Sequence, residues 1–190
     1  IDNVVKALRL REVRALRGFT RIDPVPDLGD MGEVEAIHAG IAPISKDEDL
    51  GWLPGVELRG EGIFITLDRA RLEEWESSLS VNKYGEELEK SQLRWAEDHG
   101  IENPVRRTPR FVLIHSLSHL LLRQMELEAG YPGSSLRERI YCSETMAGFL
   151  IYTATPDSEG TLGGLVELAR DDDFGPMLTR ALRATECCTN

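Results

Sequence analysis

Two histidines four residues apart, His115 and His119, have the spacing of a metal-binding pair. On a helix both imidazoles lie on one face and can share one ion. Zinc proteases of the HExxH type place a general-base glutamate after the first histidine, whereas this chain has Ser116 there. We expect structural histidines that satisfy buried polar groups; contact with a partner or DNA, and metal binding, remain alternatives. A metal-dependent hydrolase would also need an acid, such as Glu144 or Asp157.

The chain has only three cysteines, Cys142, Cys187 and Cys188. This number is too small for a disulfide framework and favours a reducing compartment, which we take to be the cytoplasm. Cys142 falls in an expected strand, where it would act as a buried apolar residue. The adjacent Cys187 and Cys188 cannot complete a four-ligand zinc site alone, but can supply the first ligand of a site completed elsewhere.

Arginines gather in two places. They are Arg11, Arg14, Arg17 and Arg21 near the start, and Arg106, Arg107 and Arg110 before the longest apolar segment. On a helix the first group would line one face, although Gly18 and the β-branched residues near it favour an extended second half. Such a series is usually a solvated or ion-paired face. The alternative is a strip that contacts nucleic-acid phosphates.

The overall charge limits the possible partners. The formal net charge is −11, whereas independent duplex-DNA binders usually carry a basic surface. Tight non-specific DNA binding by the chain alone is therefore not expected, but a local basic patch beside a DNA-holding partner is compatible with this charge. No signal peptide is recognisable, and no apolar run approaches the roughly 20 residues that span a bilayer.

One apolar segment dominates the chain. Residues Phe111 to Glu128 contain neither glycine nor proline and are apolar on most sides, which predicts a buried helix over about 110–129. Gly130 follows as a helix-stopping residue. The other expected elements surround it. They are short helices over 2–10 and 174–186, polar helices over 69–79 and 86–99, and strands over 56–68, 136–142 and 148–155.

This order of elements favours an α+β fold, with a small mixed or antiparallel sheet packed around the buried central helix. We expect Trp95 to be a packing residue and the strand over 148–155 to be central. Gly163 and Gly164 follow a Gly-rich turn, where a sharp bend or close packing is expected, with anion binding at a helix start as the alternative.

We expect a single domain over 1–190, with an N-terminal portion (1–104) containing a long loop and polar helices, and a core (105–190). Because Ile1 is not an initiator methionine, we also expect a piece of a longer polypeptide.

Several blocks of sequence resemble the DrmB family of the DISARM anti-phage system. The blocks, in family order, are LREVRALRGFTRIDP, GIFITLD, FVLIHSLSHLLLRQMELEAGY, SLRERIY and GFLIYTATPDSEGTLGGLV. The chain is also similar, more loosely, to the zinc-binding C-terminal domain of MrfA-type repair helicases. The resemblance extends from Leu10 to Cys188.

The resemblance implies a non-catalytic accessory protein that works with a DrmA-type superfamily-two helicase and engages DNA with it. It also implies a four-cysteine zinc site in the full-length domain, with Cys187 as first ligand and Cys188 close behind. Since the other cysteines of that set are absent from this chain, we expect no zinc there in the chain alone. A pure assembly scaffold without DNA contact and a metal-dependent hydrolase remain alternatives.

Overall fold

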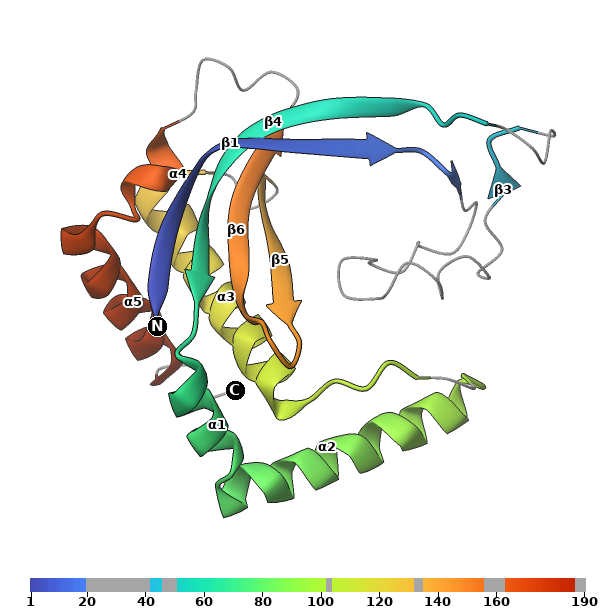
Figure 1. The fold of residues 1–190 in the computed structure, drawn as a ribbon, viewed down its shortest axis with the longest axis vertical. Coiled ribbons are helices and arrows are strands. Elements are labelled where there is room, and N and C mark those ends of the chain that lie inside the picture. Colours follow the sequence, from blue (N-terminus) through green and yellow to red (C-terminus); the bar gives the residue numbers. More distant parts are fainter. Residues whose placement is uncertain (20–41, 46–50, 102–103, 132–134, 156–162, 187–190) are drawn as a thin grey trace.

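The computed structural model describes residues 1–19, 42–45, 51–101, 104–131, 135–155 and 163–186. Four strands form one antiparallel sheet in the order β1–β4–β6–β5 (Figure 1). They are β1 (Asn3–Ala15), β4 (Gly55–Thr66), β5 (Leu136–Cys142) and β6 (Ala147–Thr155). The short strands β2 (Gly18–Phe19) and β3 (Ala42–Pro43) form a separate pair. The predicted α+β class is confirmed, and the sheet is antiparallel.

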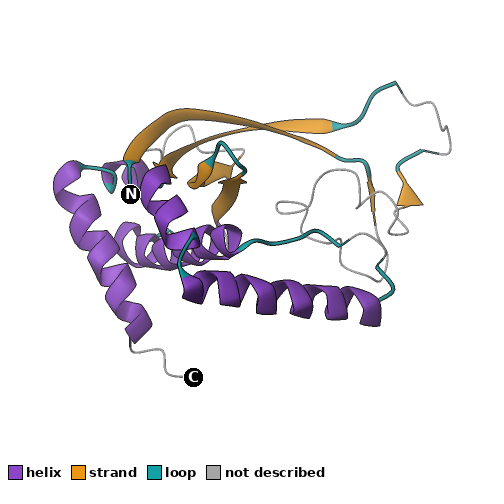
Figure 2. Cartoon of the chain, turned by 60° about the horizontal axis from the view of Figure 1, so that its bottom comes forward, coloured by secondary structure: helices purple, strands orange, loops and turns teal. Residues whose placement is uncertain are grey.

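The helices gather on one side of the four-stranded sheet (Figure 2). They are α1 (Arg69–Glu76), α2 (Leu79–Asp98), α3 (Pro109–Ala129), α4 (Gly164–Glu167) and α5 (Asp171–Glu186). Helix α3 contacts β5, β6 and α5. The sheet takes β1 and β4 from the first 104 residues and β5 and β6 from the rest, so the two portions share one core. No helix within the described ranges is long and apolar enough to cross a membrane.

The inner face of the sheet is apolar because every second residue of the central strands points toward α3. Ile63 lies opposite Ile151, and Ile65 lies opposite Phe149, all fully buried. Helix α3 adds the fully buried Ile114, Leu121 and Met125. The predicted central position of the 148–155 strand is thus confirmed by its place as β6.

Helix α3 has the boundaries that its sequence indicates. Thr108 accepts a hydrogen bond from the Phe111 amide at 3.2 Å, and Pro109 occupies the first turn. Gly130 ends the helix with a left-handed φ of 70°. The helix is not enclosed on all sides, since Leu127 is 79% exposed.

Two predicted elements differ from the structure. The segment 2–10 was expected to be helical but belongs to strand β1, because pairing with β4 provides its hydrogen bonds over almost its whole length. The second polar helix begins at Leu79 and includes Gly85, which was expected to precede it. A Cβ at Gly85 would lie 3.2 Å from the Pro109 ring, so glycine permits a close approach between α2 and the start of α3.

The packing prediction for Trp95 was wrong. Trp95 is 55% exposed and stacks on His99, with ring centroids 4.5 Å apart, rather than entering the core. On α5, Leu182 is 47% exposed, and Thr185 is also exposed. The helix instead buries Phe174, Met177 and Ala181.

A buried carboxylate holds α4 against the sheet. Glu61 on β4 is 1% exposed and accepts hydrogen bonds from the backbone amides of Gly163 at 2.6 Å and Leu165 at 2.8 Å. The Tyr131 hydroxyl donates a third bond at 3.2 Å. Burial, followed by the neighbouring Glu61 charge, raises the pKa of Tyr131. The anion at this helix start is therefore a side chain of the protein itself.

The two glycines at this point have separate structural reasons, as their sequence predicted. Gly163 adopts a φ of 131°, a conformation that disfavours side chains. A Cβ on Gly164 would lie 3.3 Å from the Tyr131 hydroxyl oxygen. Both positions therefore allow the chain to approach Glu61 and Tyr131 closely.

We predict that Glu61→Gln lowers the free energy of unfolding by about 2–3 kcal/mol, measured by urea denaturation. Glutamine has one acceptor oxygen and would direct an amide donor at one of the backbone N–H groups. Tyr131→Phe, which removes a single donor, should cost about 1 kcal/mol. A Glu61→Gln cost no larger than that of Tyr131→Phe would contradict the role of the carboxylate.

Gly148 generates a second stability prediction. A Cβ there would lie 2.4 Å from the Ile65 carbonyl oxygen, so Gly148→Ala should destabilise the fold by about 1–3 kcal/mol or more through overpacking. Gly175 in α5 is the matched control, since nothing lies within 4 Å of a Cβ there. Gly175→Ala should leave the thermal midpoint unchanged or raise it. Equal effects of the two substitutions would refute this packing argument.

Candidate metal centre

Helix α3 and strand β5 bring together two imidazoles and one carboxylate. The Oε1 atom of Glu138 lies 3.0 Å from His115 Nε2 and 3.1 Å from His119 Nε2. The two Nε2 atoms are 2.9 Å apart. The predicted i, i+4 spacing on a helix places both rings on the same face, and β5 supplies the third group. These residues form a candidate metal-binding group within the described chain.

Ser118 orients the Glu138 carboxylate from the buried side of the group. Its side chain is fully buried, and its hydroxyl lies within hydrogen-bond reach of Glu138 Oε2 and 2.8 Å from the His115 carbonyl oxygen. A hydroxyl proton serves one acceptor at a time, and a carboxylate is the stronger acceptor. Oε2 is thus occupied inside the protein, while Oε1 faces the two imidazoles.

The two histidines that were expected to satisfy buried polar groups are not themselves fully buried. The side chains of His115 and His119 are 30% and 58% exposed, and that of Glu138 is 20% exposed. The sequence prediction also missed Glu138 as the acid. Glu144 is exposed in the turn after β5 and is not part of the group, and Asp157 lies outside the described residues.

A signal for Glu138 exists in the sequence. It alternates with Leu136 and Ile140 along β5, so a charged residue occupies an inward-facing position of an otherwise apolar pattern. Inward-facing charges are uncommon unless they are paired. Cys142, on the same face, is half-buried against the core, and burial raises the pKa of its thiol.

The arginines near the N-terminus do not form one strip. Because they lie on strand β1, three residues apart, Arg11 and Arg14 point to opposite faces. Arg11 forms an ion pair with Glu57 at 2.5 Å, and Arg14 pairs with Glu12. Hydrogen bonds from Arg11 and then Arg59 lower the pKa of Glu57. These contacts bear out the ion-paired interpretation for this part of the group.

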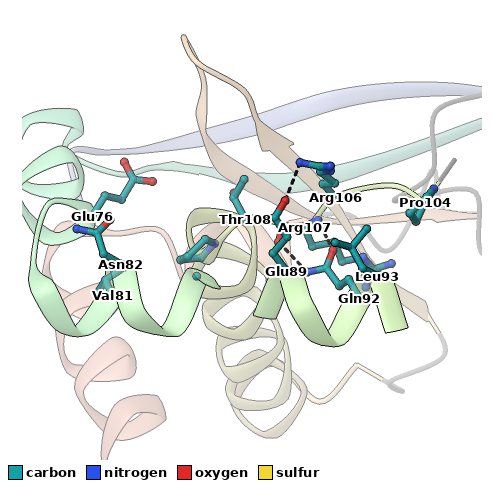
Figure 3. Close-up of a pocket in the computed structure, with 12 residues that line it drawn as sticks. Glu76, Val81, Asn82, Glu89, Gln92, Leu93, Pro104, Arg106, Arg107 and Thr108 are labelled. Atoms are coloured by element: carbon teal, nitrogen blue, oxygen red, sulfur yellow. Dashed lines mark hydrogen bonds and ion pairs between the residues drawn. The ribbon is translucent and has the colours of Figure 1, made fainter. Parts of the chain in front are cut away.

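The arginines before α3 line a groove of about 400 Å³ between α2 and the segment 104–109 (Figure 3). Arg106 pairs with Glu89 of α2 at 2.6 Å. The side-chain amide of Gln92 donates to the Arg107 carbonyl oxygen at 2.9 Å and accepts from its N–H at 2.8 Å. These two hydrogen bonds fix the backbone of the segment. The Arg107 guanidinium lies 5.3 Å from the Phe111 ring centre.

Arg110 has a structural environment. Its guanidinium donates two hydrogen bonds to the Glu76 carboxylate, at 2.8 and 2.6 Å, and one to the Ser143 carbonyl oxygen at 2.9 Å. The hydrogen bonds to Glu76 raise the pKa of Arg110 further. Only 16% of its side chain is exposed. Arg110 therefore joins α1, α3 and the turn after β5.

Two arginines of the predicted set remain exposed without an acidic partner among the described residues, namely Arg17 and Arg107. The structure therefore separates the seven candidates into paired and exposed positions. Arg21, Cys187 and Cys188 lie outside the described residues, so their predicted roles remain predictions.

Comparisons with known proteins agree with the sequence blocks. Residues 117–190 match the family model described as the MrfA Zn-binding domain. The matched range includes His119 and Glu138. The whole chain aligns with a DISARM protein DrmB from Bacillus paralicheniformis at 36% identity over 191 residues, covering 100% of this chain and 33% of that protein.

The chain thus spans about a third of the length of the curated relative that it matches. The sequence blocks and the two comparisons point to the same family. Over its whole length the chain is similar to a DISARM protein DrmB, and its residues 117–190 are similar to the MrfA Zn-binding domain.

Proposed function

We propose that the chain is part of a non-catalytic accessory subunit of a cytoplasmic DISARM anti-phage complex, where it assists DNA binding beside a DrmA-type superfamily-two helicase. The observation that carries the proposal is the similarity to a DISARM protein DrmB along the whole chain. The acidic net charge of −11 supports a role beside a DNA-holding partner rather than independent binding.

The ion pairs narrow the residues that would contact DNA. A phosphate must compete with Glu57, Glu89 or Glu76 for the arginines paired with them. Arg17 and Arg107 face no such competition among the described residues. In this proposal Arg17 and Arg107 contact phosphates, while Arg110 is structural and Arg11, Arg14 and Arg106 contribute less.

The double substitution Arg17→Gln/Arg107→Gln should weaken DNA binding by the complex and reduce its salt dependence. Each lost phosphate contact lowers the slope of log K against log salt by about 0.7 for single strands and about 0.9 for duplex DNA. Two lost contacts therefore change the slope by about 1.4–1.8. Fluorescence anisotropy at several salt concentrations measures both quantities.

The matched control is Arg71→Gln/Arg183→Gln, which removes the same charge from two exposed arginines outside the predicted set. It should leave the slope nearly unchanged. An unchanged slope for both double variants, with the helicase still co-purifying, would remove the DNA contact and favour the alternative of a pure assembly scaffold.

A metal-dependent hydrolase is the second candidate, supported by the group of His115, His119 and Glu138. Two observations make the hydrolase less well supported than the accessory function. Ser116 stands where HExxH enzymes carry the general base, and it is exposed. Glu138 is the carboxylate of the group and already faces both imidazoles. It is therefore placed as a metal ligand rather than as a general base.

A further inference from the structure

The three atoms at the centre of the candidate site are only poorly satisfied by hydrogen bonds among themselves. An ionised carboxylate oxygen offers only lone pairs, and each neutral imidazole Nε2 carries either one proton or one lone pair. If both nitrogens are protonated, both can donate to Glu138 Oε1, but the two N–H groups then crowd each other, with their nitrogens only 2.9 Å apart. If either is unprotonated, its lone pair faces Glu138 Oε1 at 3.0 or 3.1 Å. Every such arrangement leaves one unfavourable side of the triangle.

A cation resolves this conflict, because all three lone pairs then point at the same ion. We propose that His115 Nε2, His119 Nε2 and Glu138 Oε1 bind one Zn²⁺, at a site separate from the cysteines at the end of the chain. Tetrahedral zinc with bonds of about 2.0–2.1 Å separates its ligand atoms by about 3.3 Å. The observed separations of 2.9–3.1 Å therefore need to expand only by a few tenths of an ångström.

The donor set selects the metal. Two imidazoles and one carboxylate suit Zn²⁺, whereas Ca²⁺ and Mg²⁺ prefer sets made of oxygen atoms. Three protein ligands leave the fourth position of a tetrahedral ion open. His119 is 58% exposed, so this position faces solvent and takes water or a donor from another polypeptide.

Ser118 completes the site as a positioning residue. By holding Glu138 Oε2, it directs Oε1 toward the ion and fixes the carboxylate before the metal arrives. The ion would join α3 to β5, which are already in contact through apolar side chains and through the Ser118–Glu138 hydrogen bond. The site thus stabilises the packing between the central helix and an edge strand of the sheet.

Zinc binding is tested in the 190-residue chain carrying Cys187→Ser/Cys188→Ser, which removes the competing thiolates. This background should bind one equivalent of Zn²⁺ by elemental analysis after dialysis. Zinc at about 100-fold above Kd should raise Tm by roughly 5–10 °C. Co²⁺ should bind without a thiolate charge-transfer band.

Single substitutions in the same background assign the ligands. His119→Gln and Glu138→Gln should each abolish stoichiometric zinc and the Tm rise, and Ser118→Ala should weaken zinc binding about 10-fold. The matched controls are His99→Gln and Glu144→Gln, an exposed histidine and an exposed glutamate outside the group. Both controls should retain zinc.

The proposal is overturned if the folded Cys187→Ser/Cys188→Ser background takes up no zinc. It is equally overturned if His119→Gln and Glu138→Gln bind zinc as the controls do. Circular dichroism of the apo variants excludes misfolding as the cause, since His119 is exposed and its replacement leaves the core unchanged. None of these outcomes depends on DNA binding or on the helicase, so the test is independent of the proposed function.

Discussion

The enclosure of the Glu61 carboxylate is the constraint on which much of this fold depends. A buried charge is costly unless hydrogen bonds compensate it, and Glu61 at 1% exposure has two backbone donors and one hydroxyl donor. Those donors come from the start of α4 and from the segment after α3, whereas Glu61 belongs to β4. One side chain therefore fixes the relative positions of the sheet and two other segments, and the glycines at 163 and 164 let the chain approach it closely.

Electrostatics elsewhere follow from the acidic composition. Where acids outnumber bases, several of the described arginines pair with a carboxylate of the chain, as Arg11, Arg106 and Arg110 do. Exposed pairs of this kind contribute little to stability, but they lower the availability of a guanidinium for phosphate. In the proposed function, only the part of the basic surface that escapes internal pairing would be available to a nucleic acid, and a partner would supply the remaining affinity.

The sequence predicted those helices and strands whose limits are set by residues within or next to the element itself. The limits of α3 follow from Thr108, Pro109 and Gly130, and β6 follows from a short apolar run. Strand β1 was missed because its hydrogen bonds come from β4, some 40–60 residues away in the sequence. For the same reason, the sequence predicted only the two histidines of the candidate metal-binding group. The histidines share a helix, but Glu138 joins them only through the packing of β5 on α3.

Helix α3 also makes polar contacts with β5 and with the turn that follows it. Among the described strands, β5 lies at an edge of the sheet and pairs only with β6. An edge strand lacks the second neighbour that holds a central strand in place. Glu138 in its middle faces the imidazoles of α3, and the Ser143 carbonyl oxygen just beyond its end accepts from Arg110. The polar side of α3 therefore contacts β5 and the residue just after it, and these contacts help to fix a strand that has only one neighbour in the sheet.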